Sequence, residues 1–382
     1  MRSAPKPPVL SALPAEKGHF RSIFKSRRPP GGFFHETQTR ARAGIRSSHP
    51  GPGLLPDSII AVNFKSPAIQ SLAAVLALFL PGPGCSPAPP DPAAAADSAT
   101  KQDAQGMVWR VSGGKTPFFL AGSFHLLRTS DYPLPASYET AWRESSHLVF
   151  EIPPGDAQQP GIAAAIQNLT LLKSGTLPEH IAPATWQDLT QWAQETSYPM
   201  AALEQQTPWM AGLTVAVATS AQLGFKSEYG IERHFITRLA GSGKTTEGLE
   251  TTLGQLQLFQ QISAPQQEAM LRQALIEAEN MAGKAATLAS AWRQGDTSTL
   301  HATMAGSFHD FPEIKKLLLD DRNAAWLPRL EALLQGDQPT MVLVGAGHLC
   351  GPGSLIDLLQ AKGYRCVQMK PEAIPAPLKK AA

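Results

Sequence analysis

Two apolar segments of this chain each run directly into a Gly-x-x-His motif. The first, FFLAGSFH, contains Gly122 and ends at His125, and the second, VLVGAGH, contains Gly345 and ends at His348. Because glycine lets a chain turn sharply away from a strand, each histidine is expected at the carboxyl end of a strand, where open α/β sheets form ligand crevices. One such histidine alone is usually a turn residue. Two of them, far apart in the sequence, predict a sheet whose histidine-bearing strand ends converge at one site.

Histidine side chains commonly bind first-row metals, and a carboxylate beside them would strengthen such a site. Glu151 follows the apolar residues Leu148–Phe150, and Glu250 ends the strand-like segment EGLE. A glutamate in such a position costs free energy unless it is paired or bound to a ligand, although an exposed strand end or a helix N-terminus would also accommodate it. We expect Glu151 to enter the crevice formed by His125 and His348.

From Met107 onward the sequence alternates between strand-like and helix-like segments. Strands are expected at 108–111, 118–121, 147–152, 246–249, 341–344 and 364–369, and helices at 137–145, 185–195, from 208 onward, 228–239, 263–293, 312–319, 322–334 and 353–362. Ser263 and Gln266 form a capping box at one helix start, and Pro328 is expected to kink or restart another helix. The last strand, helix and strand form a βαβ unit. This order predicts an α/β domain over residues 107–370, with a mixed sheet, helices on its faces and a large helical insertion.

The first 61 residues differ in composition from the rest. They hold ten Lys/Arg against three Asp/Glu and show neither helical nor strand periodicity, so we expect a disordered basic segment over 1–61. Arg27 and Arg28 resemble a twin-arginine export signal, but no apolar segment follows them directly. A solvated basic tail is the simpler interpretation, and a translation start after this segment is a third. The remainder of the chain is acidic overall, so a protein that coats nucleic acid is not indicated.

Residues 62–85 have the features of an export signal. Lys65 precedes an apolar stretch, 68–80, that is too short to span a bilayer at ~20 residues per helix but fits a secretory signal. A small residue followed by Cys85 then resembles a bacterial lipoprotein cleavage site, in which the cysteine is lipidated, although Pro83 departs from that pattern. We therefore expect export to the bacterial envelope, as a periplasmic protein or a membrane-anchored lipoprotein.

The remaining segments and cysteines complete the expected organisation. Residues 86–106, which are rich in Pro, Ala and Asp, are expected to form a linker, and 371–382 a flexible tail. If Cys85 is lipidated, Cys350 and Cys366 remain. We expect these two not to pair, because one would open a helix and the other lies in the following strand.

Two features imitate known sites. The segment GSGKT at 241–245 looks like part of a phosphate-binding loop, but Arg238 stands where that loop needs glycine, and a strand rather than a helix follows. Glu232 and His234 lie two apart on an expected helix and therefore cannot share a face. The sequence has no Gly-x-Ser-x-Gly and no His-Glu-x-x-His motif, which disfavours serine hydrolases and zincins. A nucleotide site is not expected.

Three segments of the chain resemble the bacterial TraB/GumN family. They are LAGSFHLLRTSDYPLPASYETAWRESSHLVFEI, YGIERHFITRLAGSGKTTEGLETTLGQLQLF and VLVGAGHLCGPGSLIDLLQAKGYRC. The resemblance covers about residues 107–370 in the same order, and the paired Gly-x-x-His motifs and the GLET segment make it specific. The family is related to the Tiki metalloproteases and the erythromycin-esterase-like fold. The resemblance therefore implies a divalent-metal-dependent hydrolase, with Mn²⁺ or Co²⁺ as the metal in the Tiki relatives.

The resemblance also implies roles for individual residues. The two motifs and the glutamate of the family map onto His125, His348 and Glu151, which would hold the metal. Arg322 and Asn323 resemble the family's Arg-Asn pair. From this position Arg322 would hold a substrate carbonyl or order a carboxylate.

Two functional classes follow from the sequence. The first is a peptidase-like hydrolase that uses Mn²⁺, Co²⁺ or Zn²⁺ on a peptide or another small envelope substrate, with Glu250 or Glu232 helping to move the proton. Glu232 stands where the family usually has an acidic residue, so it would contact the metal-binding side chains rather than the ion itself. The second class is a non-catalytic accessory lipoprotein that uses the same scaffold in envelope or polysaccharide work. In both classes a lipid anchor would be the contact with the membrane, and neither nucleic acid nor nucleotide is an expected partner.

Overall fold

The computed structural model describes residues 103–370, in which six strands form one mixed sheet. The strands are β1 (Val108–Ser112), β2 (Phe118–Ser123), β3 (His147–Phe150), β4 (Thr245–Gly248), β5 (Thr340–Gly345) and β6 (Arg365–Gln368), in the spatial order β4-β3-β5-β2-β1-β6. The four strands β4, β3, β5 and β2 run parallel, whereas β1 pairs antiparallel with both β2 and β6. The predicted α/β class with a mixed sheet is therefore confirmed.

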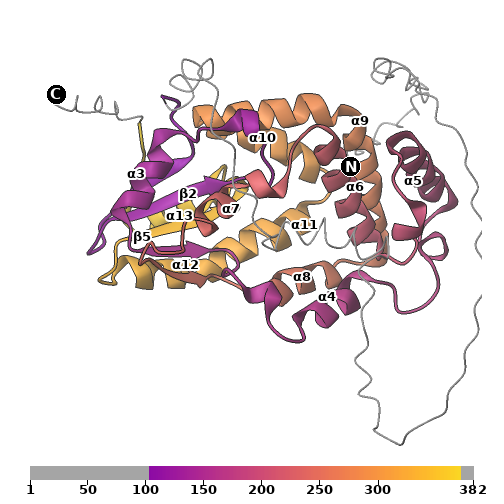
Figure 1. The fold of residues 1–382 in the computed structure, drawn as a ribbon, viewed down its shortest axis with the longest axis horizontal. Coiled ribbons are helices and arrows are strands. Elements are labelled where there is room, and N and C mark those ends of the chain that lie inside the picture. The colour runs from indigo at the N-terminus through magenta and orange to yellow at the C-terminus, as the bar shows by residue number, and fades with distance from the viewer. Residues whose placement is uncertain (1–102, 371–382) are drawn as a thin grey trace, which may run out of the picture. The chain divides into compact units, whose positions relative to one another are not determined.

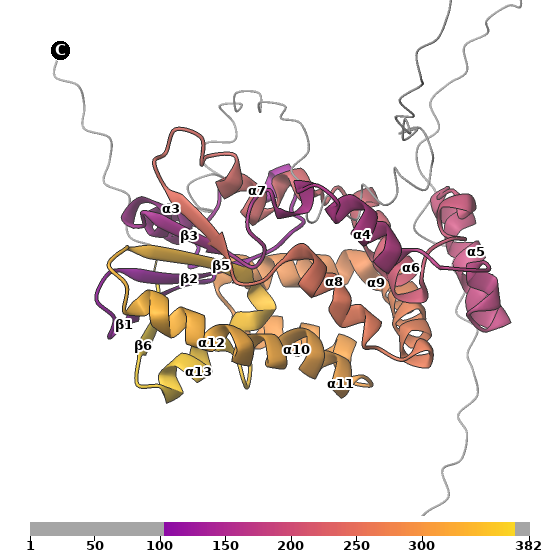
Figure 2. The same cartoon turned by 90° about the horizontal axis from the view of Figure 1, so that it is seen from below.

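The central strands are apolar because both faces of the sheet are covered. Strands β2 and β3 are buried along their whole length, and β5 along all but its last residue. Helix α3 (Ala136–Glu144) lies on one face of the sheet, and α12 (Asp321–Leu334) and α13 (Leu355–Ala361) lie on the other (Figure 2). The main hydrophobic core fills the space between these layers.

A large helical insertion extends from one end of the sheet (Figure 1). Its helices are α4 (Ile162–Thr170), α5 (Pro183–Thr196), α6 (Pro208–Gln222), α8 (Thr252–Gln260), α9 (Ala264–Gln294), α10 (Thr297–Phe308) and α11 (Pro312–Lys315). Helix α7 (Ile231–Ile236) instead packs on the main core beside α3, where Phe235 stacks on Trp142. Helix α6 packs along α9, and two smaller hydrophobic clusters lie within the insertion. In one of them Trp209 stacks on Phe259 at 4.5 Å between ring centroids. The predicted capping box of Ser263 and Gln266 begins α9, as expected.

Helix α12 is continuous through Pro328, so the expected restart at this residue is wrong. Proline removes one backbone hydrogen bond from a helix interior. Pro328 lies on the exposed side of α12, however, and Trp326 and Leu330 on either side of it are buried in the main core. Packing of this buried face maintains the helix across the proline.

Other differences from the predicted elements are local. The expected helix 228–239 is a short 3₁₀ turn, Ser227–Tyr229, followed by α7, and the expected helix 312–319 is α11 followed by a π-helical turn, Lys316–Asp320. The last strand, helix and strand are present, but β6 does not neighbour β5. It pairs with β1 at the edge of the sheet.

Several of the predicted segments lie outside the described residues. These are the basic segment 1–61, the export signal 62–85 with Cys85, most of the linker 86–106, and the tail 371–382. At the end of the expected linker, the backbone oxygen of Gln105 accepts a hydrogen bond from Ser137, and the amide of Gly106 donates one to Arg293. The folded region therefore begins slightly before Met107.

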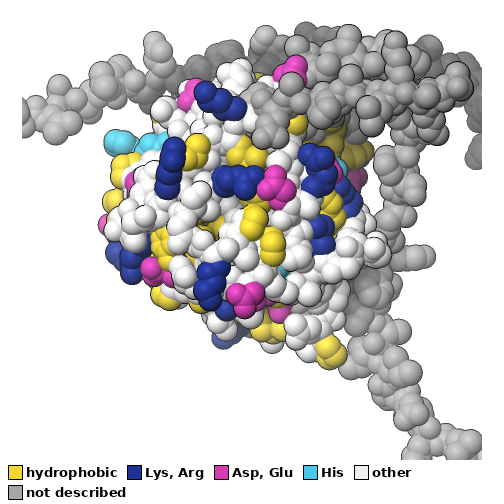
Figure 3. All heavy atoms as spheres, turned by 90° about the vertical axis from the view of Figure 1, so that its left-hand side faces the viewer, with side chains coloured by type: hydrophobic (Ala, Val, Ile, Leu, Met, Phe, Trp, Pro, Cys, Tyr) yellow, Lys and Arg dark blue, Asp and Glu magenta, His cyan; other side chains and the backbone are white. Residues whose placement is uncertain are grey.

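Within residues 103–370 the two cysteines do not pair, as expected: Cys350 and Cys366 are both free thiols. None of the helices in this region is long and apolar enough to cross a membrane. On the face shown in Figure 3, Lys and Arg side chains are spread among Asp, Glu and hydrophobic side chains.

Candidate functional site

The two Gly-x-x-His motifs lie at the same edge of the sheet. Strands β2 and β5 pair in parallel, and their register places Gly122 beside Val344 and Ser123 beside Gly345. The segments that follow both strands leave the sheet at its carboxyl edge, where open α/β sheets bind ligands. The strand ends that carry the two motifs therefore lie side by side at one edge of the sheet.

The motif glycines are needed for space rather than for an unusual backbone conformation. Neither Gly122 nor Gly345 has a positive φ angle, so neither position requires glycine for its backbone conformation. A Cβ atom on Gly345 would lie 3.2 Å from Oε1 of Glu151, and one on Gly122 would lie 3.2 Å from Cα of Ala346. The absent side chain instead lets the amide of Gly345 donate a hydrogen bond to Glu151 at 2.6 Å.

His348 is a buried, neutral imidazole whose tautomer is determined by its neighbours. Its Nδ1 lies 2.7 Å from Oδ1 of Asn323, and because an amide oxygen only accepts, Nδ1 carries the hydrogen. The other nitrogen, Nε2, accepts from Arg322 at 3.1 Å. Burial lowers the pKa of His348 to about 4, against the attraction of Glu151. The 3.7 Å approach of His348 to Glu151 is therefore not an ion pair at neutral pH.

His125 is held in the opposite charge state. Its Nδ1 lies 3.0 Å from Oε1 of Glu232, which also accepts a hydrogen bond from Ser123. The negative charge of Glu232 raises the pKa of His125 to about 9, although burial acts in the other direction. The side chain of His125 is 42% exposed, so this histidine is the open member of the pair.

A buried arginine connects the two glutamates of the site. Nη2 of Arg322 donates to Oε2 of Glu151 at 2.5 Å, and its Nε donates to Oε2 of Glu250 at 3.2 Å. The amide of Gln255 donates to both carboxylates. Burial alone would raise the pKa of Glu151, but the charge of Arg322, the two nearby histidines and the hydrogen bond from Gly345 together outweigh it and lower this pKa to about 2. Burial raises the pKa of Glu250, although Arg322 opposes it.

The donors at this site fit a divalent metal ion in kind. Each imidazole has its Nδ1 hydrogen-bonded to a side-chain oxygen, from Glu232 or Asn323, so Nε2 is the nitrogen that could bind a ligand, although in His348 this atom accepts a hydrogen bond from Arg322. Metal-binding histidines are usually oriented in this way. As arranged, no group of three His, Cys, Asp or Glu side chains among residues 103–370 surrounds a common ion position. The guanidinium of Arg322 lies among the donors instead.

Three residues that shape the site were not predicted from the sequence. Ser123 is the first of the two unspecified residues in the first Gly-x-x-His motif, yet its hydroxyl is buried against Glu232. Gln255 follows the GLET segment by one helical turn and bridges the two glutamates. A Cβ atom on Gly230 would lie 2.3 Å from the backbone oxygen of His125. In the sequence, Gly230 is marked only by its position directly before the residues that form a helix.

The features that imitate other sites have structural roles. The ammonium of Lys244, in the segment that resembles a phosphate-binding loop, donates to the backbone oxygens of Trp142 and Ser145. A strand follows this segment, as expected. Glu232 faces His125, whereas His234 contacts Arg238, so these two residues of α7 point to different partners, as predicted.

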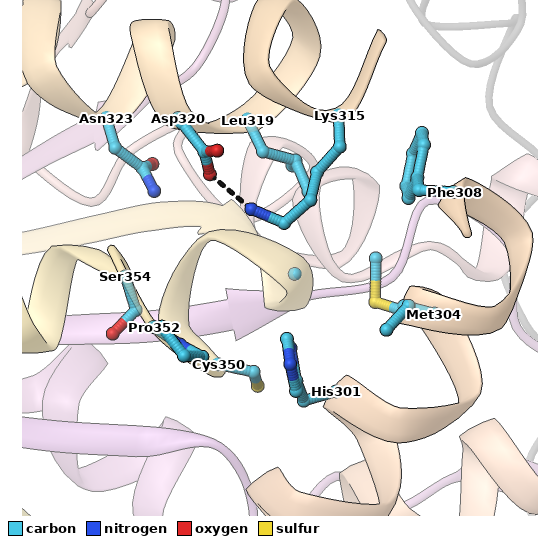
Figure 4. A pocket seen from close by; sticks show the side chains of 12 residues that line it. His301, Met304, Phe308, Lys315, Leu319, Asp320, Asn323, Cys350, Pro352 and Ser354 are labelled. Atoms are coloured by element: carbon cyan, nitrogen blue, oxygen red, sulfur yellow. Dashed lines mark hydrogen bonds and ion pairs between the residues drawn. The ribbon is translucent and has the colours of Figure 1, made fainter. Parts of the chain in front are cut away.

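A small recess is lined on one side by Asn323 (Figure 4). It encloses about 370 Å³, including space open to solvent, between helix α10, the segment from α11 to α12, and the loop after β5. Met304 and Phe308 form an apolar wall, and an ion pair between Lys315 and Asp320, 2.6 Å long, borders the recess on an adjacent side (Figure 4). Asn323, which orients His348, lines the same recess.

Comparison with known proteins gives a consistent family assignment. The chain is 26% identical to the uncharacterized protein YbaP of Escherichia coli strain K12 over 251 residues, which cover 65% of this chain and 89% of that protein. It is 25% identical to the uncharacterized protein YbaP of Shigella flexneri over 245 residues, which cover 63% of this chain and 87% of that protein. No solved structure matches the chain significantly. The model of the TraB/PrgY/gumN family matches residues 107–368, most of the described region, and the chain therefore belongs to this family.

Proposed function

We propose that this protein is a divalent-metal-dependent hydrolase of the peptidase-like kind, with the metal held by His125, His348 and Glu151. The observation that carries the proposal is the matched orientation of the two histidines. Nδ1 of each ring is hydrogen-bonded to a side-chain oxygen, which belongs to Glu232 at His125 and to Asn323 at His348. Both histidines follow parallel neighbouring strands that end beside Glu151. Such outer partners hold the ligand nitrogens ready for an ion. Mn²⁺, Co²⁺ and Zn²⁺ are all compatible with this mixed His and Glu donor set.

The residues around the ion would divide the remaining work. A bound divalent ion would lower the pKa of a water molecule and polarise a substrate carbonyl. Glu250, whose pKa burial raises, would accept the proton of that water. Arg322 carries N–H groups that can donate to a substrate carbonyl or carboxylate. Glu232 and Asn323 would act through the two histidines, by fixing their rings.

His125 carries a proton at neutral pH in the metal-free chain, and this proton has to leave before the imidazole can bind an ion. Metal binding should therefore release protons and become tighter as the pH rises toward 9. A buffer-dependent heat of Mn²⁺ binding, measured by calorimetry in buffers of different ionisation enthalpy, would report this release.

Export and lipid anchoring belong to the same proposal. The apolar stretch 68–80 and Cys85 support a secreted precursor that is cleaved before the cysteine. Intact-mass analysis of the protein from its native cells should show a chain that begins at a lipid-modified Cys85. A mature chain that retains Met1 would refute this part of the proposal and leave the site chemistry unaffected.

A turnover assay tests the hydrolase directly. The protein should cleave members of a peptide library when Mn²⁺, Co²⁺ or Zn²⁺ is added, and a chelator should abolish the cleavage. Glu250→Gln should reduce kcat strongly, because the proton acceptor is lost. Glu313→Gln, which changes a glutamate at the start of α11, is the control and should leave kcat unchanged. Metal binding without cleavage of any library member would favour a non-catalytic accessory lipoprotein.

A further inference from the structure

Arg322 engages the same atoms that a metal ion would need. Its side chain is only 11% exposed, and its guanidinium contacts Glu151, Glu250 and the Nε2 atom of His348. These partners include two of the three ligands in the proposed function, on which this inference rests.

The lone pairs at the site cannot serve both cations at once. Nε2 of His348 has a single lone pair, and the Nη1–H of Arg322 points at it from 3.1 Å. Oxygen Oε2 of Glu151 accepts from both Arg322 and Gln255, whereas Oε1 accepts from the amide of Gly345 and retains one lone pair. An ion that bound His348 and Glu151 would therefore have to displace the guanidinium.

The charges at the site also indicate that the ion and the guanidinium of Arg322 exclude each other. Glu151 and Glu250 bring two carboxylates into a poorly solvated space, and Arg322 supplies one compensating positive charge. A divalent ion beside that guanidinium would be repelled at close range in a medium of reduced dielectric constant. Without the guanidinium, the same two carboxylates would attract the ion more strongly.

We propose that Arg322 is a built-in competitor of the metal ion: it occupies the donor set in the metal-free chain and must move away for the ion to bind. Two other contacts can retain the displaced side chain nearby. Nη1 of Arg322 also donates to the backbone oxygen of Leu318, and its guanidinium lies 4.7 Å from the ring centroid of Trp326. The arginine thereby sets how much free metal is needed to load the site.

Calorimetric titration with Mn²⁺ alone tests this competition without any substrate. The variants are Arg322→Leu, which removes the competitor, and Arg329→Leu as the matched control. Arg329 lies on the same helix and binds Glu247 through two hydrogen bonds of 2.5 and 2.9 Å, outside the site. Arg322→Lys is a second variant that retains the charge and protects the test if the leucine variant folds poorly. Metal-induced changes in Tm are recorded in parallel.

Arg322→Leu should bind Mn²⁺ about tenfold more tightly than the wild type or better, because a close positive charge is gone. Its Tm should be lower without metal and should rise more on addition of Mn²⁺, since an ion that binds only the folded state stabilises it in proportion to affinity. Arg322→Lys should fall between, and Arg329→Leu should match the wild type.

Two results would contradict the proposed competition between Arg322 and the ion, and they have different consequences for the proposed metal site. If the wild type binds Mn²⁺ and Arg322→Leu binds it equally or less tightly, Arg322 does not compete, and the proposed metal site stands. If neither protein binds Mn²⁺, Co²⁺ or Zn²⁺, the metal-dependent function fails, and the competition fails with it.

Discussion

Oδ1 of Asn323 lies 2.7 Å from Nδ1 of His348, so one buried amide determines which nitrogen of this imidazole carries the hydrogen. The same amide donates through Nδ2 to the backbone oxygen of Gly353. Asn323 thus joins helix α12 to the loop that follows β5, and it leaves Nε2 of His348 as an acceptor directed at Arg322.

Replacing Asn323 should disturb the site through His348. In Asn323→Ala the Nδ1–H loses its acceptor, and we expect metal affinity and turnover to fall by about 10- to 100-fold, as is typical when an outer partner of a ligand is removed. Asn323→Asp retains an oxygen at the same place and should lose much less. Nitrogen-15 NMR of the imidazole would report the tautomer, and an unchanged tautomer in Asn323→Ala would contradict the assigned role.

Glu232 should control the protonation of His125. The carboxylate raises the pKa of His125 to about 9, so Glu232→Gln should bring this pKa back toward the ordinary value near 6.5. Proton NMR titration of the histidine ring would measure the shift. Glu247→Gln is the matched control, because Glu247 lies beside His147 instead. If the pKa of His125 is the same in Glu232→Gln and wild type, another group holds the proton.

One buried and one half-buried neutral histidine should make the folded state sensitive to acid. Burial lowers the pKa values of His234 and His348 to about 4, whereas in the unfolded chain these residues titrate near 6.5. As the pH falls from 6.5 to 4, the unfolded chain takes up protons that the folded chain does not, so the free energy of unfolding decreases. Urea unfolding at several pH values should show this loss, and His234→Gln, which lies outside the site, should have a shallower dependence. A variant as acid-sensitive as the wild type would show that His234 does not contribute.

Space at Gly345 should matter more than its backbone freedom. In Gly345→Ala the new Cβ would lie 3.2 Å from Oε1 of Glu151, in the region where the amide of this residue binds that carboxylate. We expect loss of the hydrogen bond, a lower Tm and weaker metal binding. Gly283→Ala is the comparison, because a Cβ there meets nothing within 4 Å inside helix α9, and alanine should stabilise it by up to ~1 kcal/mol. Equal effects of the two substitutions would contradict the argument from space.

The sheet and its histidine-bearing edge could be predicted because their signals are local. Runs such as FFLAGS and TMVLVG are apolar apart from glycine and one terminal Ser or Thr, which marks buried parallel strands, and each ends at a motif that can be read in a few residues. The strand order could not be predicted in the same way. The position of β6 beside β1 depends on pairing between residues more than 200 apart.

The partners within the site were also hidden, because they come from different elements. The hydrogen bonds from Ser123 to Glu232 and from Gln255 to Glu151 join residues about 100 positions apart, and no periodicity reports such a contact. The family resemblance indicated Arg322 and Asn323 as site residues, and in the structure both contact His348. It did not reveal that Arg322 would lie among the donors themselves.

Metal binding by the two histidines tests the central proposal most directly. Equilibrium dialysis against Mn²⁺, Co²⁺ and Zn²⁺, with metal content read by mass spectrometry, should show one ion per chain in the wild type. His125→Ala, His348→Ala and the double variant should retain none, Glu151→Gln should bind more weakly, and circular dichroism should show all of them folded. His309→Ala, which changes an exposed histidine, should bind like the wild type. Equal metal content in the wild type and the double variant, or none in any protein under any condition, would contradict the proposed metal centre.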